Sequence, residues 1–228
     1  MMLSIIIPAY NEEAFIAKVL EKVFSIPSSI DKEVIVVDDG SRDGTLEILE
    51  SLKLKYNFKL ISHENNLGKG AAIKSGIREA QGTHTIIQDA DLEYDPQEIP
   101  KLLKEMNEDV WAVYGRRPSR RAPERGVHYI VGAKLLTLTI NLLYGAHLKD
   151  AYTGYKLFNL NKLNKETFLN LRSSGFEFEA EITCKILKSK GKIIEVPIEY
   201  TPRGKSEGKK INFKDAVRGF ITTISSLW

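Results

Sequence analysis

Apolar residues in the first half of the chain follow two alternating patterns. Five continuous apolar runs, rich in Val and Ile, occupy residues 3–8, 33–39, 58–62, 84–89 and 110–115. Four segments between them repeat apolar residues every three or four positions, at residues 12–24, 43–56, 68–80 and 96–106. The continuous runs indicate strands buried on both faces, and the spaced segments indicate helices, the second capped by Asp43 or Ser41. The pattern therefore predicts an α/β fold with a mainly parallel sheet flanked by helices.

The second half of the chain has a different pattern. Residues 116–126 are basic and rich in loop-forming residues, whereas residues 127–144 are apolar nearly all round a helix. Two apolar stripes run along that helix, one of Val131, Leu135, Leu138 and Leu142, the other of Tyr129, Leu136, Ile140 and Leu143. A helix near residues 175–191, a strand at 192–200 and an amphipathic helix at 212–228 follow. We predict a single domain of residues 1–228 with two halves, 1–115 and 116–228.

Composition and charge narrow the classes of protein. With 43% hydrophobic and 28% charged residues the chain has an ordinary globular composition, which excludes disorder. The net charge of +3 is too small to indicate a nucleic-acid partner. A lone cysteine, Cys184, excludes a disulfide framework and fits a reducing compartment. The N-terminus does not resemble a signal peptide, and no apolar run reaches the ~20 residues needed to span a bilayer.

Polar residues gather where three of the predicted strands end. The first strand is followed by Tyr10 and Glu12, the second by Asp38 and Asp39, and the fourth by "DADLE", residues 89–93. Carboxyl ends of parallel strands share one edge of a sheet, where ligands of such folds bind. Asp89, Asp91 and Glu93 alternate and so share one face in extended chain. Such a cluster suits Mg²⁺ or Mn²⁺, with a diphosphate completing the site; the alternative is ordinary turn and cap chemistry.

Other polar motifs are less informative. "NLGKGAAIKSG", residues 66–76, lacks the spacing of a dinucleotide or phosphate loop, so we interpret it as a turn and helix start in which only Lys69 is placed to contact a ligand. The four histidines share no metal-ligand spacing and are interpreted as structural. Glu177 and Glu181 lie one helical turn apart, with Glu179 on a different face. Exposed helix charges and a role in acceptor binding both remain open for these glutamates.

Several motifs, in order and spacing, resemble a known family. "IIIPAYNEE", "VVDDGSRDGT", "NLGKGAAIKSGI" and "QDADLEYDP" resemble glycosyltransferase family 2, inverting enzymes that use nucleotide-diphosphate sugars. "GRR", "DAYTGYKLF", "GFEFEAEI" and "EVPIEYTPRGKSEGKKI" resemble its polyprenyl-phosphate branch, typified by dolichyl-phosphate mannose synthase. The resemblance covers almost the whole chain. It implies a GT-A fold, with a Rossmann-like sheet and C-terminal amphipathic helices, in which residues 1–115 bind the nucleotide sugar and residues 116–228 bind the acceptor.

The resemblance also implies roles for individual residues. The base and ribose would be held by Pro8, Tyr10, Glu12, Val37 and Asp39. The ribose and diphosphate would lie along Asp89, Ala90 and Asp91, with Asp91 and Glu93 on Mg²⁺ or Mn²⁺. Arg117 would approach the sugar or the acceptor phosphate, which makes Asp91 and Arg117 the expected catalytic residues, and Arg203 and Lys209 would close over the diphosphate. Glu93 stands where the mannose synthases usually carry Gln, so a donor of GDP-mannose or UDP-glucose type is expected without a choice between them.

The implied reaction agrees with the residues. A divalent cation and basic side chains would stabilise the departing nucleotide diphosphate. A polyprenyl phosphate is already anionic and needs no strong general base, only cations, which residues 116–125 could supply. The helices at 127–144 and 212–228 would lie at the membrane interface, giving a peripheral protein at the cytoplasmic membrane face, unless the first is a buried core helix. Three alternatives remain open: a saccharide hydroxyl acceptor, a sugar nucleotidyltransferase and a non-catalytic binding module.

Overall fold

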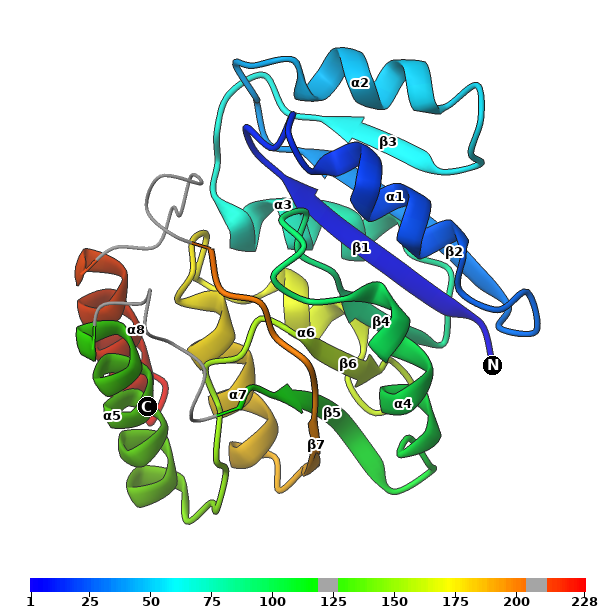
Figure 1. The fold of residues 1–228 in the computed structure, drawn as a ribbon. Coiled ribbons are helices and arrows are strands. Elements are labelled where there is room, and N and C mark those ends of the chain that lie inside the picture. Colours follow the sequence, from blue (N-terminus) through cyan, green and yellow to red (C-terminus); the bar gives the residue numbers. More distant parts are fainter. Residues whose placement is uncertain (119–126, 204–212) are drawn as a thin grey trace.

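The computed structural model describes residues 1–118, 127–203 and 213–228. Seven strands form one sheet (Figure 1): β1 (Leu3–Ala9), β2 (Lys32–Asp38), β3 (Lys59–Ser62), β4 (His84–Ile87), β5 (Val110–Arg116), β6 (Lys156–Asn159) and β7 (Lys192–Pro197). The described helices are α1 (Ile16–Phe24), α2 (Thr45–Leu52), α3 (Lys69–Glu79), the 3₁₀ turn η1 (Pro96–Glu98), α4 (Ile99–Lys104), α5 (Val127–Tyr144), α6 (Lys165–Leu169), α7 (Phe178–Lys188) and α8 (Phe213–Ser225).

The sheet has the strand order β3-β2-β1-β4-β6-β5-β7. The pairs β1–β2, β1–β4, β2–β3 and β5–β7 are parallel, while β6 runs antiparallel to β4 and β5. The predicted mainly parallel sheet is therefore confirmed, with one antiparallel strand, β6, that the pattern did not predict. Along β1, Ile5 and Ile7 pack with α1 on one face of the sheet, and Ile6 packs with α3 on the other. Burial on both faces explains why these strands read as continuous apolar runs.

Several predicted boundaries differ from the structure. Helix α1 begins at Ile16 rather than residue 12, α2 ends at Leu52 rather than residue 56, and β7 ends at Pro197. The predicted caps of α2 are wrong, because Gly44 is the N-cap residue. Asp43 instead accepts hydrogen bonds from the backbone N–H and hydroxyl of Thr45, one residue further in. The short helix α6 was not predicted.

Helices α5 and α8 pack against each other and against α7, at the side of the molecule where the C-terminus lies (Figure 1). In the second predicted stripe of α5, Leu136 and Ile140 are buried, whereas Leu143 is exposed. The first stripe is exposed, and so is the apolar face of α8: Val131, Leu135, Leu138, Leu142, Val217, Phe220, Ile221 and Ile224. Helix α5 is thus neither a fully buried core helix nor a fully exposed one. Within the described residues, no helix has both the length and the apolarity that crossing a bilayer requires.

Candidate active site

The carboxyl ends of β1, β2 and β4 place the predicted donor residues at one edge of the sheet. Asp39, just beyond β2, donates its backbone N–H to the carbonyl of Ala9 at 2.7 Å. Its carboxylate accepts hydrogen bonds from the N–H groups of Leu67 and Gly68 at 3.0 and 2.8 Å. One carboxyl oxygen also lies 2.7 Å from Nδ1 of His63. Asp39 therefore fixes the loop before α3, and His63 supports it, in line with a structural role for this histidine.

The predicted base-binding residues differ in what they expose. Val37 is fully buried in β2, where it packs with Ala72 of α3 and pairs with β1 and β3, so neither its side chain nor its backbone is exposed to a ligand. Ala90 is buried in the core on the α1 face of the sheet. Pro8 and Tyr10 are half-buried at the end of β1. Sequence position alone did not distinguish the buried members of this group, Val37 and Ala90, from the partly exposed ones, Pro8 and Tyr10.

Arg203 brings together residues from distant parts of the chain. Its Nη1 atom lies 2.9 Å from Oε2 of Glu12, and its Nη2 atom lies 2.8 Å from Oδ2 of Asp91. Its backbone N–H donates to Glu93 at 2.8 Å, and the hydroxyl of Tyr200 donates to the other oxygen of Glu93 at 2.7 Å. Four residues predicted for the donor site, Glu12, Asp91, Glu93 and Arg203, thus form one cluster.

The carboxylate of Asp91 is the electrostatic centre of this cluster. The pKa of Asp91 is raised to about 7, mainly by burial and then by the neighbouring Asp89 and Glu93 carboxylates, while Arg203 opposes the shift. A buried acid surrounded by other acids favours a cation, and carboxylate oxygens are the ligands that Mg²⁺ and Mn²⁺ prefer. The donor set therefore fits such an ion. Within the described residues, however, no group of three or more acidic, His or Cys side chains forms a complete metal site. Oxygens of a bound diphosphate would have to complete it.

Asp89 belongs to a second, buried network of charges. Its Oδ1 atom lies 2.7 Å from Nζ of Lys69, which also lies 3.3 Å from Oε1 of Glu179. Glu179 in turn is 2.5 Å from Nζ of Lys156, a side chain with no exposed surface. Burial opposes the charge on Lys69, but Asp89 and Glu179 outweigh it and raise the pKa of the lysine. The network needs space at Gly154, where a Cβ would lie 2.8 Å from Oδ2 of Asp89.

This network corrects one open interpretation of the sequence. Glu179 and Glu181 are not exposed helix charges, because both are buried. Glu181 accepts hydrogen bonds from the backbone N–H groups of Arg172 and Ser173 at 2.9 and 2.8 Å, so it holds the loop before α7. Glu179 had been considered only for the acceptor side, and Lys156 was missed as a site residue. In the sequence, Lys156 and Glu179 stand out only as charged residues among apolar and aromatic neighbours, in "GYKLF" and "FEFEAEI".

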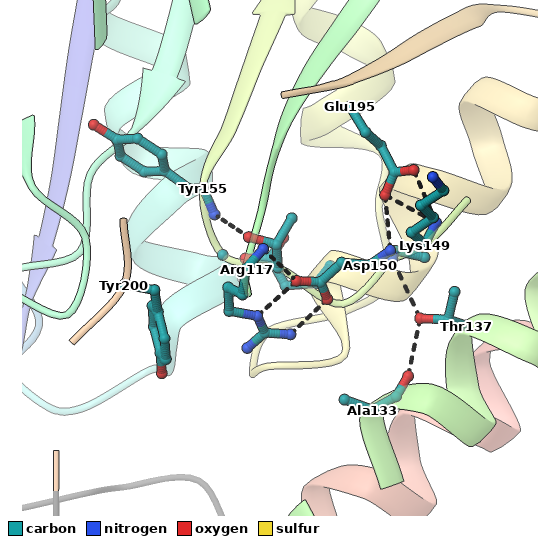
Figure 2. Close-up of polar contacts among 12 residues, drawn as sticks. Arg117, Ala133, Thr137, Lys149, Asp150, Tyr155, Glu195 and Tyr200 are labelled. Carbon is teal, nitrogen blue, oxygen red and sulfur yellow. Dashed lines mark hydrogen bonds and ion pairs between the residues drawn. The ribbon is translucent and has the colours of Figure 1, made fainter. Parts of the chain in front are cut away.

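Arg117 lies at the end of β5, on the other side of the antiparallel strand β6. Its Nε and Nη2 atoms each lie 2.7 Å from an oxygen of Asp150 (Figure 2). The guanidinium carbon is 5.7 Å from the centre of the Tyr200 ring. A hollow of about 450 Å³ adjoins this arginine, lined by Arg116, Arg117, Pro118, Lys149, Pro197 and Ile198. Its three basic residues make it suited to an anion. Lys209 and the arginines at positions 120, 121 and 125 lie outside the described residues.

Comparisons with known proteins agree with this architecture. Residues 4–166 match the sequence model described as Glycosyl transferase family 2. A dolichyl-phosphate beta-glucosyltransferase of Trichomonas vaginalis is 30% identical over 94% of this chain and 69% of its own length. A dolichol-phosphate mannosyltransferase of Pyrococcus furiosus is 31% identical over 92% of this chain, which spans 59% of that relative.

The solved structures show the same fold at lower identity. Glucosyl-3-phosphoglycerate synthase from Mycobacterium tuberculosis in complex with UDP has a TM-score of 0.75 and 20% identity, over 99% of this chain and 79% of that one. The same enzyme with Mn²⁺, UDP-glucose and phosphoglyceric acid has a TM-score of 0.74. The predicted GT-A fold is therefore confirmed. With a family match over more than half of its length, the chain belongs to glycosyl transferase family 2 and is a glycosyltransferase.

Proposed function

We propose that the protein is a metal-dependent, inverting transferase that moves a hexose from a nucleotide-diphosphate sugar to a polyprenyl or dolichyl phosphate. The observation that carries the proposal is the extent of the match to the dolichyl-phosphate transferases. It covers 92–94% of this chain and so includes most of the second half, with Arg117. The donor would be of GDP-mannose or UDP-glucose type. Residues 1–115 would bind it, and residues 116–228 would bind the acceptor.

In this proposal the donor lies at the carboxyl ends of β1, β2 and β4. The base and ribose contact Pro8, Tyr10, Glu12 and Asp39, and the diphosphate follows Asp89, Ala90 and Asp91. Mg²⁺ or Mn²⁺, the ions named in the related structures, would bind Asp91 and Glu93 and stabilise the charge of the departing diphosphate. One oxygen of Glu93 accepts a hydrogen bond from Tyr200 and the other from Arg203. Each carboxylate oxygen has two lone pairs, so these two bonds do not by themselves prevent Glu93 from binding the ion. Arg203 and Lys209 would then cover the diphosphate.

The acceptor side needs cations rather than a base. A phosphate oxygen attacks the anomeric carbon as an anion, so no proton has to be removed first. Arg117 and the basic hollow beside it offer charge-assisted hydrogen bonds to such a group. The exposed apolar faces of α5 and α8 support a peripheral position at the cytoplasmic membrane face, where the lipid part of the acceptor resides.

The test is transfer of labelled hexose by the purified protein. GDP-mannose and UDP-glucose are each offered with Mg²⁺, Mn²⁺ or EDTA, and with a polyprenyl phosphate, a saccharide or 3-phosphoglycerate as acceptor. We expect label in the lipid phosphate alone, loss of transfer in EDTA, and at least a hundredfold loss in Asp91→Asn. The matched control is Asp109→Asn, which changes an exposed acid just before β5. Label in the saccharide or in phosphoglycerate would replace the acceptor assignment, and unchanged transfer by Asp91→Asn would refute the metal site.

A further inference from the structure

We infer that Glu195 is a positioning residue for Arg117, acting through Asp150, and that helix α5 shares in this positioning. The inference rests on the proposed role of Arg117 at the acceptor phosphate. It starts from the segment of residues 148–151, which connects α5 to the loop before β6 and is drawn in part in Figure 2. Asp150 of this segment holds Arg117 through both carboxyl oxygens. The contacts that fix Asp150 therefore also fix the position of Arg117.

Hydrogen bonds to side chains, and not pairing between strands, fix the backbone of residues 148–151. Glu195 accepts hydrogen bonds from the backbone N–H of Lys149 at 2.8 and 2.9 Å and from that of Asp150 at 2.7 Å. Both N–H groups converge on one carboxylate, which fixes the backbone from which the Asp150 side chain extends. Bonds to a charged acceptor are about twice as strong as those between neutral groups. Glu195 thus determines where the Asp150 carboxylate lies.

Glu195 is also tied to Arg117 through the sheet. It lies on β7, directly opposite Tyr114 of the parallel strand β5, and Arg117 follows the last residue of β5. The two strands therefore present the glutamate and the arginine from one rigid surface. Asp150, which is 8% exposed, bridges between them, accepting from the backbone N–H of Arg117 at 3.1 Å as well as from its guanidinium. A guanidinium held by two bonds to one carboxylate, which also binds the backbone N–H of the same residue, has few orientations left.

Helix α5 holds the two ends of the same segment. Asn141 accepts from the backbone N–H of Leu148 at 3.0 Å and donates to its carbonyl at 2.8 Å. Thr137 accepts from the backbone N–H of Ala151 at 3.2 Å and donates to the carbonyl of Ala133 at 2.9 Å (Figure 2). Four consecutive backbone N–H groups, from residue 148 to residue 151, are thus accepted by side chains of α5 and β7. Because α5 exposes an apolar face on its other side, any contact made by that face acts on the element that holds Asp150.

This arrangement does more than stabilise a loop. The basic hollow is lined by both Arg117 and Lys149, so the residues that Glu195 fixes are the ones that would meet an anionic acceptor. A structural role alone would lower stability without a preference for either substrate. A positioning role predicts a defect in the use of the acceptor while the donor, bound on the far side of β6, is used normally.

The experiment compares Glu195→Gln with Glu199→Gln. Glu199 is an exposed glutamate four residues further along the chain, just beyond the end of β7. The first readout is the NMR signal of the Arg117 Nε–Hε group, assigned by its loss in Arg117→Lys. We expect the same protected signal in the wild type and Glu199→Gln. In Glu195→Gln we expect it to move toward the position of free arginine, with exchange at least roughly tenfold faster because the bond to Asp150 is loosened. An unchanged signal in Glu195→Gln, at a temperature where Asp150→Asn shifts it, would overturn the inference.

The second readout separates the two substrates. We expect kcat/KM for the polyprenyl phosphate to fall roughly 10–100-fold in Glu195→Gln, with KM for the nucleotide sugar unchanged within about twofold. An equal loss for both substrates would overturn the positioning role. If Glu195→Gln does not fold, Thr137→Val carries the same test from the helix side, with the same expected shift and the same contrary result. If the wild type transfers no sugar to any lipid phosphate, the proposed function fails, and the NMR readout still decides the positioning.

Discussion

Arg203 places its Nη2 atom 2.8 Å from Oδ2 of Asp91, although the two residues lie 112 positions apart in the chain. The same guanidinium contacts both oxygens of Glu12, at 2.9 and 3.1 Å. A cation of the protein itself therefore offsets the repulsion among Asp89, Asp91 and Glu93 when no ligand is present. Asp91 is also the residue proposed to bind the metal ion. The guanidinium and the ion would consequently share one carboxylate.

Arg203→Met tests this sharing. Removing the guanidinium takes away a charge that offsets the largely buried Glu12 and Asp91 carboxylates, and we expect a loss of about 3 kcal/mol in the free energy of unfolding measured in EDTA. Mn²⁺ should raise the unfolding temperature of Arg203→Met more than that of the wild type, because the ion no longer competes with the arginine for Asp91. Arg42→Met, an exposed arginine, serves as control. Equal shifts with Mn²⁺ in the variant and the wild type would mean that the ion binds elsewhere.

Lys69→Met tests the buried network on the other side of Asp89. Lys69 is the cation between Asp89 and Glu179, and its side chain is only 12% exposed. Breaking a buried pair leaves an uncompensated charge, so we expect the free energy of unfolding in urea to fall by about 3–5 kcal/mol. Lys53→Met, an exposed lysine beyond α2, should change it by less than about 0.5 kcal/mol. If Lys69→Met lost less than about 1 kcal/mol, the network would not contribute to folding as its geometry indicates.

The strands of the first half were predictable because burial on both faces leaves a local signature. Residues 5–8 are apolar at every position, and neighbouring residues such as Ile6 and Ile7 face opposite layers of helices. Strand β6 left no such signature. It has four residues and begins with Lys156, whose burial is tolerated only because Glu179, 23 positions away, offsets its charge.

The candidate site was likewise predictable only where its residues follow strands that the pattern had predicted. Residues at the ends of β1, β2 and β4 were found because parallel strands bring their carboxyl ends to one edge. Both Arg203 and Glu12 were expected at the donor site, but their pairing was not predictable, since the two residues are 191 positions apart in the chain. Asp150 and Glu195 were missed for the same reason. Their roles depend on which backbone N–H groups the fold brings to them, and spacing along the chain does not encode that.

Cys184 gives the fold a dependence on pH. The thiol is fully buried between α7 and α5, and burial raises its pKa from 9.0 to about 11. The folded state therefore keeps a proton that the unfolded state loses, so this contribution to stability is present below about pH 9 and is lost as pH rises through 11. At ~1.4 kcal/mol per pKa unit, about 2 kcal/mol is lost by pH 10.5.

Cys184→Ala lacks this thiol and provides the comparison. We expect the wild type to be more stable than Cys184→Ala by about 1–2 kcal/mol at pH 7.5, because the alanine leaves a small cavity. The difference in the urea-derived free energy of unfolding should then shrink by about 2 kcal/mol at pH 10.5. Buried tyrosines that do not contact Cys184 titrate alike in both proteins and cancel in the difference. Tyr144 is the exception, because Cys184 adds to the effect of burial in raising its pKa, so its titration adds to the difference. A difference that stays constant with pH would show that the thiol is not shielded from water.

The exposed faces of α5 and α8 make a prediction about membranes. Leu138 and Ile221 are 52% and 58% exposed, one on each helix, and the helices pack side by side. If these faces enter a lipid surface, each side chain, already about half-buried, contributes roughly 1 kcal/mol, about half of the value for complete burial. We expect the double variant Leu138→Ser, Ile221→Ser to bind vesicles containing anionic lipid at least about tenfold more weakly than the wild type in sedimentation. Leu54→Ser, which removes a leucine 94% exposed just beyond α2, should bind like the wild type. Equal binding by all three proteins would exclude these faces as the membrane contact and leave only charge to attract the protein to lipid.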